Sequence, residues 1–248
     1  MNTQADIANE SSQEATLGNE SLNQFAYVPG SNKYQFGYRS ISNIPITGAP
    51  NDTCWERWAM LFDGNDYRLY FFKASTNDTL YQFAFNRDTN AYEYGFNSIA
   101  TLKLTGIPSD ACSSSFAMLH DGTTYRLYLR RLGYPAVLYQ FGFNSASSNY
   151  EYGHNSIPTL EITGAPSNID WSRWGMLHDK GSYRLYAMQL GNNNVINQAA
   201  YNVATGHYEF GYNSIPELAL EGTPNDSNLG EFSMLFDGTD YRLYLQKI

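Results

Sequence analysis

The sequence has few basic residues. Its 248 residues include 15 lysines and arginines against 24 aspartates and glutamates, which gives a formal net charge of −9. Nucleic acids and anionic lipid surfaces are bound through a basic footprint, and this balance of charges does not provide one. The chain also has no apolar run near the roughly 18 residues that a membrane-spanning helix needs. We therefore expect neither nucleic-acid binding nor membrane insertion.

Cysteine is scarce as well. The two cysteines, Cys54 and Cys112, are 58 residues apart and occupy the same place in two successive repeats. Equivalent points of neighbouring repeats generally lie further apart than the roughly 7 Å that a disulfide tolerates. We therefore expect two free thiols, which favours a reducing compartment such as the cytoplasm.

The N-terminus lacks a secretory signal. The first twenty residues contain Asp6, Glu10, Glu14 and Glu20, but they have neither the basic start nor the apolar stretch of a signal peptide. We expect residues 1–21 to form a disordered acidic leader and residues 22–248 to form a single domain.

Catalytic and metal-binding motifs are also missing. There is no Gly-x-Ser-x-Gly elbow, no metal-spaced cluster of histidine and cysteine, and no phosphate-binding loop. The segments DGND at Asp63 and DGTD at Asp237 resemble calcium ligands, but the equivalent segments read DGTT and DKGS, which favours a role in turns. We predict a non-enzymatic protein without catalytic residues, metal or cofactor.

The sequence is rich in repetition and in aromatic residues. Four units begin at Tyr34, Tyr92, Tyr150 and Tyr208, always 58 residues apart, and aromatic residues make up 16% of the chain. Aromatic residues suit half-buried strands. Each unit contains four or five strand-like segments and an Asp-Gly hairpin, with no amphipathic helix. This pattern predicts an all-β fold made of four repeats.

A strand missing from the last repeat indicates how the repeats are arranged. The segments LYQFAFN at Leu80, LYQFGFN at Leu138 and INQAAYN at Ile196 follow the hairpin in three repeats, whereas the counterpart of the fourth, LNQFAYV, starts at Leu22. An N-terminal strand that completes the last repeat closes a ring and hides sheet edges. Rings of such units are β-propellers, so we predict a four-bladed β-propeller. A pair of two-repeat sandwiches is the alternative.

The chain resembles two kinds of propeller in architecture. Four blades closed by terminal strands resemble hemopexin-type domains, and the hairpin FDGNDYRLYFF is similar to their repeated strand-turn-strand segment. A ring of small repeats rich in aromatic residues is also similar to propeller lectins. The resemblance covers residues 22–248 and implies an architecture, but it implies no particular site residue.

Several polar residues are identical in all four repeats, and they are the first candidates for a site. They are Gln24, Gln82, Gln140 and Gln198; Ser40, Ser98, Ser156 and Ser214; Asp63, Asp121, Asp179 and Asp237; and Arg68, Arg126, Arg184 and Arg242. One interpretation is structural: Asp holds the hairpin turn, Arg pairs with this Asp or with a glutamate, and Gln ties one blade's strand to its neighbour. The glutamates are Glu93, Glu151 and Glu209, and the first repeat has Gln35 instead. In the other, they form one pocket per blade or blade interface, where Arg, Asp and Gln bond sugar hydroxyls beside Tyr. A third interpretation places the arginines around the axis as an anion site.

Two tryptophans break the fourfold pattern. The first and third repeats carry Trp55 with Arg57 and Trp171 with Arg173, where the other repeats have Ser113 and Leu229 in place of the tryptophan. A core position rarely accepts Trp, Ser and Leu alike, so we expect both tryptophans to be partly exposed. We predict that these Trp and Arg pairs are ligand-binding. Trp58 and Trp174 share their position with Phe116 and Phe232, which predicts core packing.

These observations predict a multivalent, lectin-like carbohydrate-binding protein with similar sites around a ring, existing as a monomer or a homodimer. The alternative is a hemopexin-like protein that binds a protein partner, a ligand or an ion through one face or the central channel.

Overall fold

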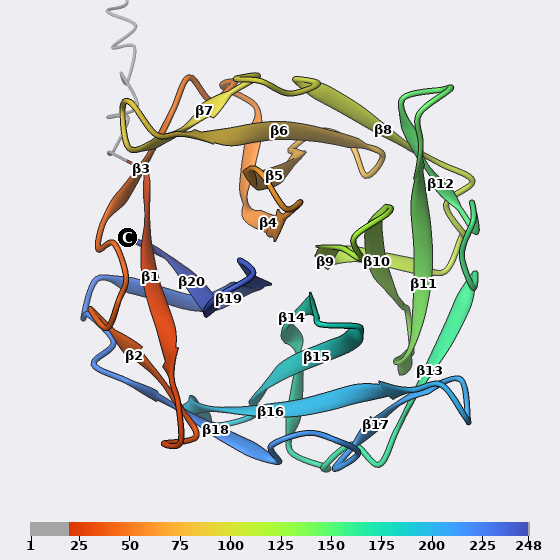
Figure 1. Ribbon diagram of the computed structural model, residues 1–248. Helices are drawn as coiled ribbons and strands as arrows, with labels where there is room; N and C mark the ends of the chain where they lie inside the picture. Colours follow the sequence, from red (N-terminus) through yellow and green to blue (C-terminus); the bar gives the residue numbers. More distant parts are fainter. Residues whose placement is uncertain (1–19, 248) are drawn as a thin grey trace, which may run out of the picture.

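The computed structural model describes residues 20–247, and within that range it contains twenty β-strands and no helix (Figure 1). Most of the predicted acidic leader lies outside the described residues. Its last residue, Ser21, already belongs to the first strand, β1 (Ser21–Val28). The prediction of an all-β protein is confirmed.

The strand pairings divide the chain into four similar groups, which we call sectors. The inner strands, nearest the centre of Figure 1, are β4 (Thr53–Phe62), β9 (Ala111–His120), β14 (Ile169–Asp179) and β19 (Ser227–Phe236). The second strands are β5 (Tyr67–Lys73), β10 (Tyr125–Arg131), β15 (Ser182–Gln189) and β20 (Tyr241–Lys247). The third strands are β6 (Thr79–Asn86), β11 (Tyr134–Asn144), β16 (Asn192–Asn202) and β1.

Each sector ends in two short outer strands that both pair with its third strand. These are β7 (Ala91–Tyr94) with β8 (Thr101–Thr105), β12 (Asn149–Tyr152) with β13 (Thr159–Thr163), β17 (His207–Phe210) with β18 (Glu217–Glu221), and β2 (Lys33–Phe36) with β3 (Ile44–Thr47). Sector 1 is thus β4–β8, sector 2 is β9–β13, sector 3 is β14–β18, and sector 4 combines β19 and β20 with β1–β3.

The third and outer strands join into one closed ring of 12 strands. Within each sector, the paired strands are antiparallel. Four parallel pairs connect the sectors: β3 with β7, β8 with β12, β13 with β17, and β18 with β2. The short outer strands alternate in burial; in β8, Leu102 and Leu104 point inward between exposed neighbours. This period of two is what a strand with one covered face requires.

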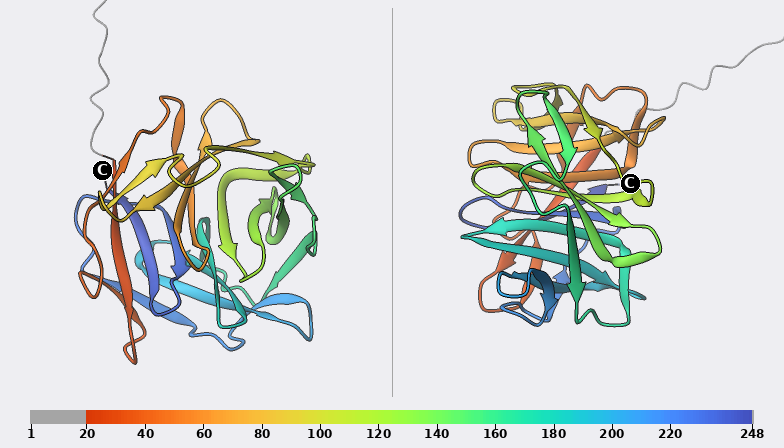
Figure 2. Two further views of the ribbon diagram at one scale, coloured as in Figure 1. Left: turned by 45° about the horizontal axis from the view of Figure 1, so that its top comes forward. Right: turned by 90° about the vertical axis from the view of Figure 1, so that its right-hand side faces the viewer.

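The two ends of the described chain pair with each other. Strand β1 lies antiparallel to β20, with Phe25 opposite Leu243 and Leu22 opposite Gln246. Figure 1 shows the C-terminus next to β1, and Figure 2 shows the same neighbourhood from two other sides. The sequence-based prediction that the N-terminal strand completes the last repeat is therefore confirmed.

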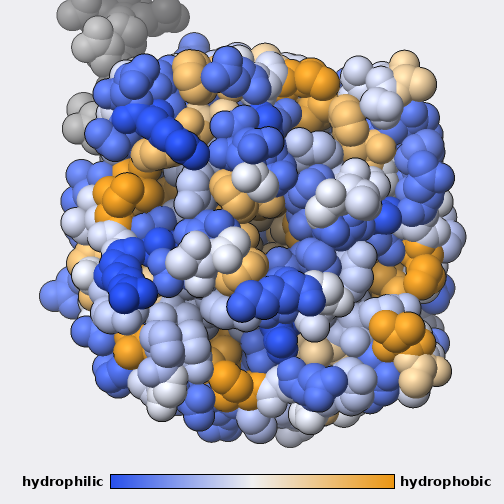
Figure 3. Space-filling model, viewed as in Figure 1, coloured by the Kyte–Doolittle hydropathy of each residue, from blue (hydrophilic) through white to orange (hydrophobic). Residues whose placement is uncertain are grey.

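The core lies between sectors rather than within them. Four buried clusters each combine side chains of two adjacent sectors. Trp58 and Trp174 belong to these clusters and are 1% and 0% exposed, as their position in the repeat predicts. Cys54 and Cys112 are free thiols, also as predicted. On the face shown in Figure 3, apolar patches are separated by hydrophilic surface and do not form one continuous area.

The inner strands define two opposite sides of the ring. On the side that we call the hairpin face, a tight turn connects each inner strand to the second strand. On the opposite side, the loop face, lie the connections from second to third strands. Toward the loop face every inner strand has a bulge, for example between Cys54 and Trp58 in β4. A bulge redirects side chains without ending the strand.

Candidate functional site

Four similar pockets lie between adjacent sectors near the hairpin face. We name each pocket after the repeated arginine that lines it. The Arg184 pocket has a volume of about 400 Å³, the Arg68 and Arg126 pockets about 360 Å³ each, and the Arg242 pocket about 300 Å³. The repeat therefore generates one concave site at each junction.

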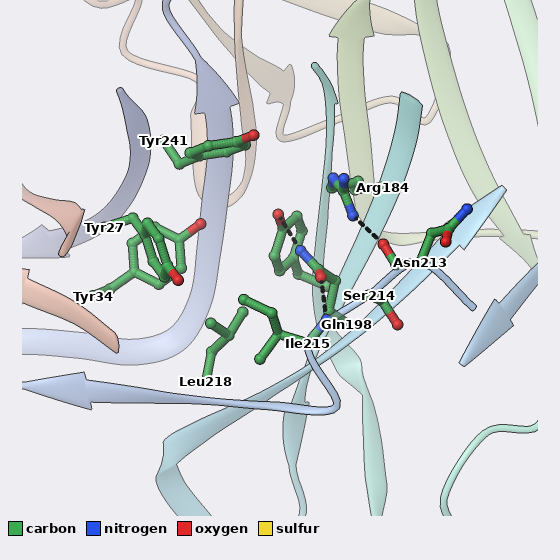
Figure 4. A pocket seen from close by; sticks show the side chains of 10 residues that line it. Tyr27, Tyr34, Arg184, Gln198, Asn213, Ser214, Ile215, Leu218 and Tyr241 are labelled. Atoms are coloured by element: carbon green, nitrogen blue, oxygen red, sulfur yellow. Dashed lines mark hydrogen bonds between the residues drawn. The ribbon is translucent and has the colours of Figure 1, made fainter. Parts of the chain in front are cut away.

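The Arg184 pocket illustrates the common design (Figure 4). Three aromatic rings of sector 4, those of Tyr27, Tyr34 and Tyr241, lie on one side. The opposite side is polar and comes from sector 3; it consists of Arg184, Gln198, Asn213 and Ser214, with Ile215 and Leu218 below. Tyr27 and Tyr241 are arranged edge to face, with ring centroids 6.0 Å apart. The pocket thus has an aromatic wall on one side and a hydrogen-bonding wall on the other.

The arginine in each pocket is held by the aspartate of its own hairpin. Arg184 donates from Nε to Asp179 at 2.7 Å and from Nη1 to the carbonyl of Asn213 at 2.7 Å. The corresponding Nε bonds join Arg68 to Asp63, Arg126 to Asp121 and Arg242 to Asp237. Of the two acidic partners expected for the arginine, the aspartate is the one that binds it in all four sectors. The aspartates themselves do not line the pockets.

Three of these aspartates, Asp63, Asp121 and Asp237, also fix their turns by accepting hydrogen bonds from backbone amides. The amides of Thr123 and Thr124 donate to Asp121 Oδ1 at 3.0 and 2.8 Å. Burial alone would raise the pKa of Asp121, but these amides, the Thr123 hydroxyl and Arg126 outweigh burial and lower the pKa to about 2. The carboxylate is therefore ionised at any physiological pH, and it orients the guanidinium beside the pocket.

The glutamine forms the back of the polar wall. Gln198 donates from Nε2 to the hydroxyl of Tyr186 at 2.6 Å, and its Oε1 accepts the amide of Ile215 at 2.8 Å. Burial raises the pKa of Tyr186, and its hydroxyl also interacts with that of Tyr34 in the next sector. Gln198 therefore acts between neighbouring strands of one sector, and Tyr186 makes the contact across the junction.

The loop that carries Asn213 shapes the rim. Asn97, Asn155 and Asn213 adopt left-handed backbone conformations, with φ of 43°, 45° and 40°, which asparagine tolerates better than most residues. Within residues 20–247, the hydroxyls of Ser98 and Ser156 are buried without a hydrogen-bond partner. Both serines line their pockets.

The Arg242 pocket departs from the common design. Arg39 replaces the asparagine, again in a left-handed conformation (φ 41°), and its carbonyl accepts a hydrogen bond from Arg242 Nη1. Arg87 also lines this pocket. This pocket is therefore the smallest and the richest in arginine.

The predicted tryptophan pairs lie elsewhere. Trp55 and Trp171 are half-buried, as expected, and belong to the bulges on the loop-face side. Trp55 packs edge to face on Phe71, and Arg57 bonds Asn77 and the carbonyls of Lys73 and Thr76. Arg173 is buried and donates to Asp170 at 2.8 Å. Neither pair lines any of the four pockets.

Other residues line the axis of the ring. Phe62, His120, His178 and Phe236 surround a small cavity there, and none of the four repeated arginines lines it. Burial lowers the pKa of both histidines below the usual value, which favours neutral imidazole rings. Within the described part of the chain, no three potential metal ligands gather into a group.

Residues 20–247 contain no helix with the length and apolar character needed to cross a membrane.

No protein-family model and no curated protein sequence matches this chain. Similar solved structures include the SapL1 lectin in complex with alpha methyl fucoside, at 14% identity and a TM-score of 0.34 over 77% of this chain and 56% of the other. An exo-beta-1,3-galactanase from Phanerochaete chrysosporium has 12% identity and a TM-score of 0.37 over 81% and 48% of the two chains. The beta-propeller domain of Cps50 (Swd1) from Myceliophteria thermophila has 10% identity and a TM-score of 0.29 over 83% and 59%. The chain thus spans between 48% and 59% of these proteins, and TM-scores this low carry no argument about ligand or activity.

Proposed function

We propose that this protein is a four-bladed β-propeller that binds carbohydrate, without catalysis, in the four pockets between its sectors. One observation carries the proposal: in the pocket at every junction, aromatic side chains of one sector lie opposite hydrogen-bonding side chains of the adjacent sector. The volumes of 300 to 400 Å³ fall at the lower end of the usual range for small-ligand sites.

This arrangement suits the chemistry of a sugar ring. A sugar has a face of C–H groups, which packs favourably on the electron-rich face of an aromatic ring. Its hydroxyls both donate and accept hydrogen bonds along the rim. In the Arg184 pocket, Arg184 offers donors, and Ser214 offers a hydroxyl that can donate or accept. Tyr27 and Tyr241 provide the aromatic surface.

The pocket linings favour binding over hydrolysis. Most enzymes that hydrolyse glycosidic bonds use a pair of carboxylic side chains on either side of the bond. Among the described residues that line the four pockets there is no aspartate or glutamate. Each nearby hairpin aspartate is engaged by an arginine and by the tyrosine hydroxyl of the next sector, so it is not free to transfer a proton.

We assign different roles to the residues predicted from the repeat. The four arginines contact ligand, the four glutamines set the back wall, and the four aspartates position the arginines. Trp55 with Arg57, and Trp171 with Arg173, which the sequence predicted to bind ligand, lie apart from these pockets on the loop-face side, and we assign them no part in glycan binding. Sites around one ring would add weak contacts together when a branched or surface-bound glycan engages several of them at once.

A glycan array probed with the full-length protein tests the proposal. Phe143 and its equivalents Phe85, Tyr27 and Tyr201 are half-buried wall residues. Replacing all four by alanine should abolish glycan binding, and Phe143→Ala alone should lower the number of sites by one in calorimetry. Trp55→Ala/Trp171→Ala is the matched control and should retain binding.

Each outcome is decisive. Loss of binding in the tryptophan variant, with retention in the wall variant, would move the site to the loop face. An array on which the folded wild-type protein binds no glycan would instead favour a protein-interaction scaffold.

A further inference from the structure

The four arginines do not have the same hydrogen-bond partners. Arg68 and Arg242 also donate from Nη2, to Asp66 at 3.2 Å and to Asp240 at 3.0 Å. The corresponding hairpin positions in the other two sectors are Thr124 and Ser182. Within residues 20–247, Nη2 of Arg126 and of Arg184 makes no hydrogen bond to the protein.

The difference leaves free donors in two pockets. A guanidinium has five N–H groups. Arg184 uses one on Nε and one on Nη1, so three remain, including both on Nη2. The Arg184 side chain is also more exposed, at 19%, than those of Arg68 and Arg126, at 12% each. A planar cation with adjacent free donors is the preferred partner of a carboxylate, which it binds through two parallel hydrogen bonds.

The charges of the hairpins reinforce this difference. The hairpin of Arg184 contains Lys180 where the other three have Gly64, Gly122 and Gly238. It has one carboxylate, Asp179, whereas the hairpin of Arg68 has both Asp63 and Asp66. An acidic ligand at Arg68 would therefore meet a second carboxylate beside the guanidinium, whereas one at Arg184 would not. The ammonium of Lys180 lies over the ring of Phe236 and does not line the Arg184 pocket.

We propose that the Arg126 and Arg184 pockets take sugars that carry a carboxylate, such as uronic or sialic acids, whereas the Arg68 pocket takes neutral sugars. This proposal rests on the proposed carbohydrate-binding function and divides the four sites into classes. The Arg242 pocket combines the second carboxylate, Asp240, with Arg39 and Arg87 from the neighbouring loops.

The repeats themselves supply the substitutions for a test. Thr124→Asp/Ser182→Asp installs in two pockets the carboxylate that the other two already have, at positions where the fold accepts aspartate. The reverse change, Asp66→Thr, frees Nη2 of Arg68. Both are made in an Arg39→Asn/Arg87→Ser background, which gives the Arg242 pocket the residues of its counterparts Asn97 and Ser145.

The probes are glycans ending in glucuronate, galacturonate or N-acetylneuraminate, each with its carboxamide as a neutral partner of the same shape. We expect the parent to prefer at least one acid over its carboxamide by about tenfold, which corresponds to about 1.4 kcal/mol. Thr124→Asp/Ser182→Asp should remove that preference while neutral glycans still bind. Asp66→Thr should add one acid-binding site in calorimetry.

The results separate this proposal from the proposed function. Binding of neutral glycans without any preference for an acid, or a preference that Thr124→Asp/Ser182→Asp leaves unchanged, would overturn the division into classes and leave the lectin function intact. Absence of binding to every glycan would overturn both. Preference for acids that weakens as salt rises would support the guanidinium as the selecting group.

Discussion

The hydroxyl of Tyr241 in sector 4 donates to Asp179 Oδ2 in sector 3 at 2.6 Å. The same bond joins Tyr67 to Asp237, Tyr125 to Asp63 and Tyr183 to Asp121, so every junction of the ring has one. Each aspartate therefore holds its own arginine and the tyrosine of the next sector, and Asp63, Asp121 and Asp237 also hold their turns through backbone amides. The residues that shape the pockets are also those that connect the sectors.

Replacing Asp121 by asparagine should destabilise the protein. The change removes the ion pair with Arg126 and weakens the bonds to the turn, and it leaves a guanidinium mostly shielded from water. We expect the free energy of unfolding to fall by about 1–3 kcal/mol. Asp66→Asn is the matched control, because Asp66 is 39% exposed and should change stability by less than about 1 kcal/mol. Urea unfolding measures both, and equal effects would contradict the assigned role of Asp121.

Acid should destabilise the protein through these hairpins. Burial opposes ionisation of Asp63 and Asp237, but amide and arginine hydrogen bonds outweigh it and lower the pKa of each, and the pKa of Asp121 falls to about 2. A lowered pKa means that the unfolded chain binds protons first. The stability these groups contribute is thus complete above the unfolded pKa near 3.8 and is lost as pH falls toward 2.

Unfolding followed between pH 6 and pH 2 tests this expectation. The midpoint in urea should decline mainly below pH 4 in the wild-type protein, and less steeply in Asp121→Asn. The same slope in both proteins would show that Asp121 does not contribute to the acid transition.

Glu231 should have the opposite pH dependence. Its side chain is buried on a bulge of β19, and neither carboxyl oxygen has a hydrogen-bond partner within residues 20–247. Burial raises its pKa well above the usual value. The free energy of unfolding should therefore be highest below the unfolded pKa of about 4.5, where Glu231 is protonated in both states. It should fall as pH rises through the folded pKa, because the folded protein then holds a buried carboxylate.

Glu231→Gln removes the cost of a buried charge. It should raise the free energy of unfolding at pH 8 by about 1–3 kcal/mol and change little at pH 4. The exposed Glu217→Gln serves as the control and should have no effect at either pH. A loss of stability in Glu231→Gln at pH 8 would show that the charge has a partner and a role.

Sequence reasoning predicted the repeat, the pairing of β1 with β20, the Asp–Arg pairs and the burial of Trp58, because each follows from position within a repeating pattern. It did not predict the bond from Tyr241 to Asp179. A repeat shows that a tyrosine recurs, but it does not show which sector its hydroxyl reaches.

The sequence also did not separate the two sides of the ring. Trp55 and Arg68 belong to the same repeat, yet they lie toward opposite ends of adjacent strands, and a bulge that spacing alone does not reveal intervenes in β4. The recurring Asn-Ser-Ile at Asn97, Asn155 and Asn213 was the available signal for the pocket rim. In the remaining repeat this segment reads Arg39-Ser40-Ile41, which was the signal that the Arg242 pocket differs from the other three.

Closure of the ring predicts that β1 contributes as much stability as its counterparts inside the chain. Phe25 in β1 and Phe83 in β6 occupy the same repeat position, and both are 0% exposed. Phe25 lies opposite Leu243, and Phe83 lies opposite Leu69. If β1 is a full member of sector 4, Phe25→Ala and Phe83→Ala should each cost about 3–5 kcal/mol. If β1 were held only by its pairing with β2 and β3, it would instead detach from β20 before the rest of the protein unfolds. Phe25→Ala would then cost far less than Phe83→Ala in urea unfolding, and the ring of sectors would be open at the junction of β1 with β20.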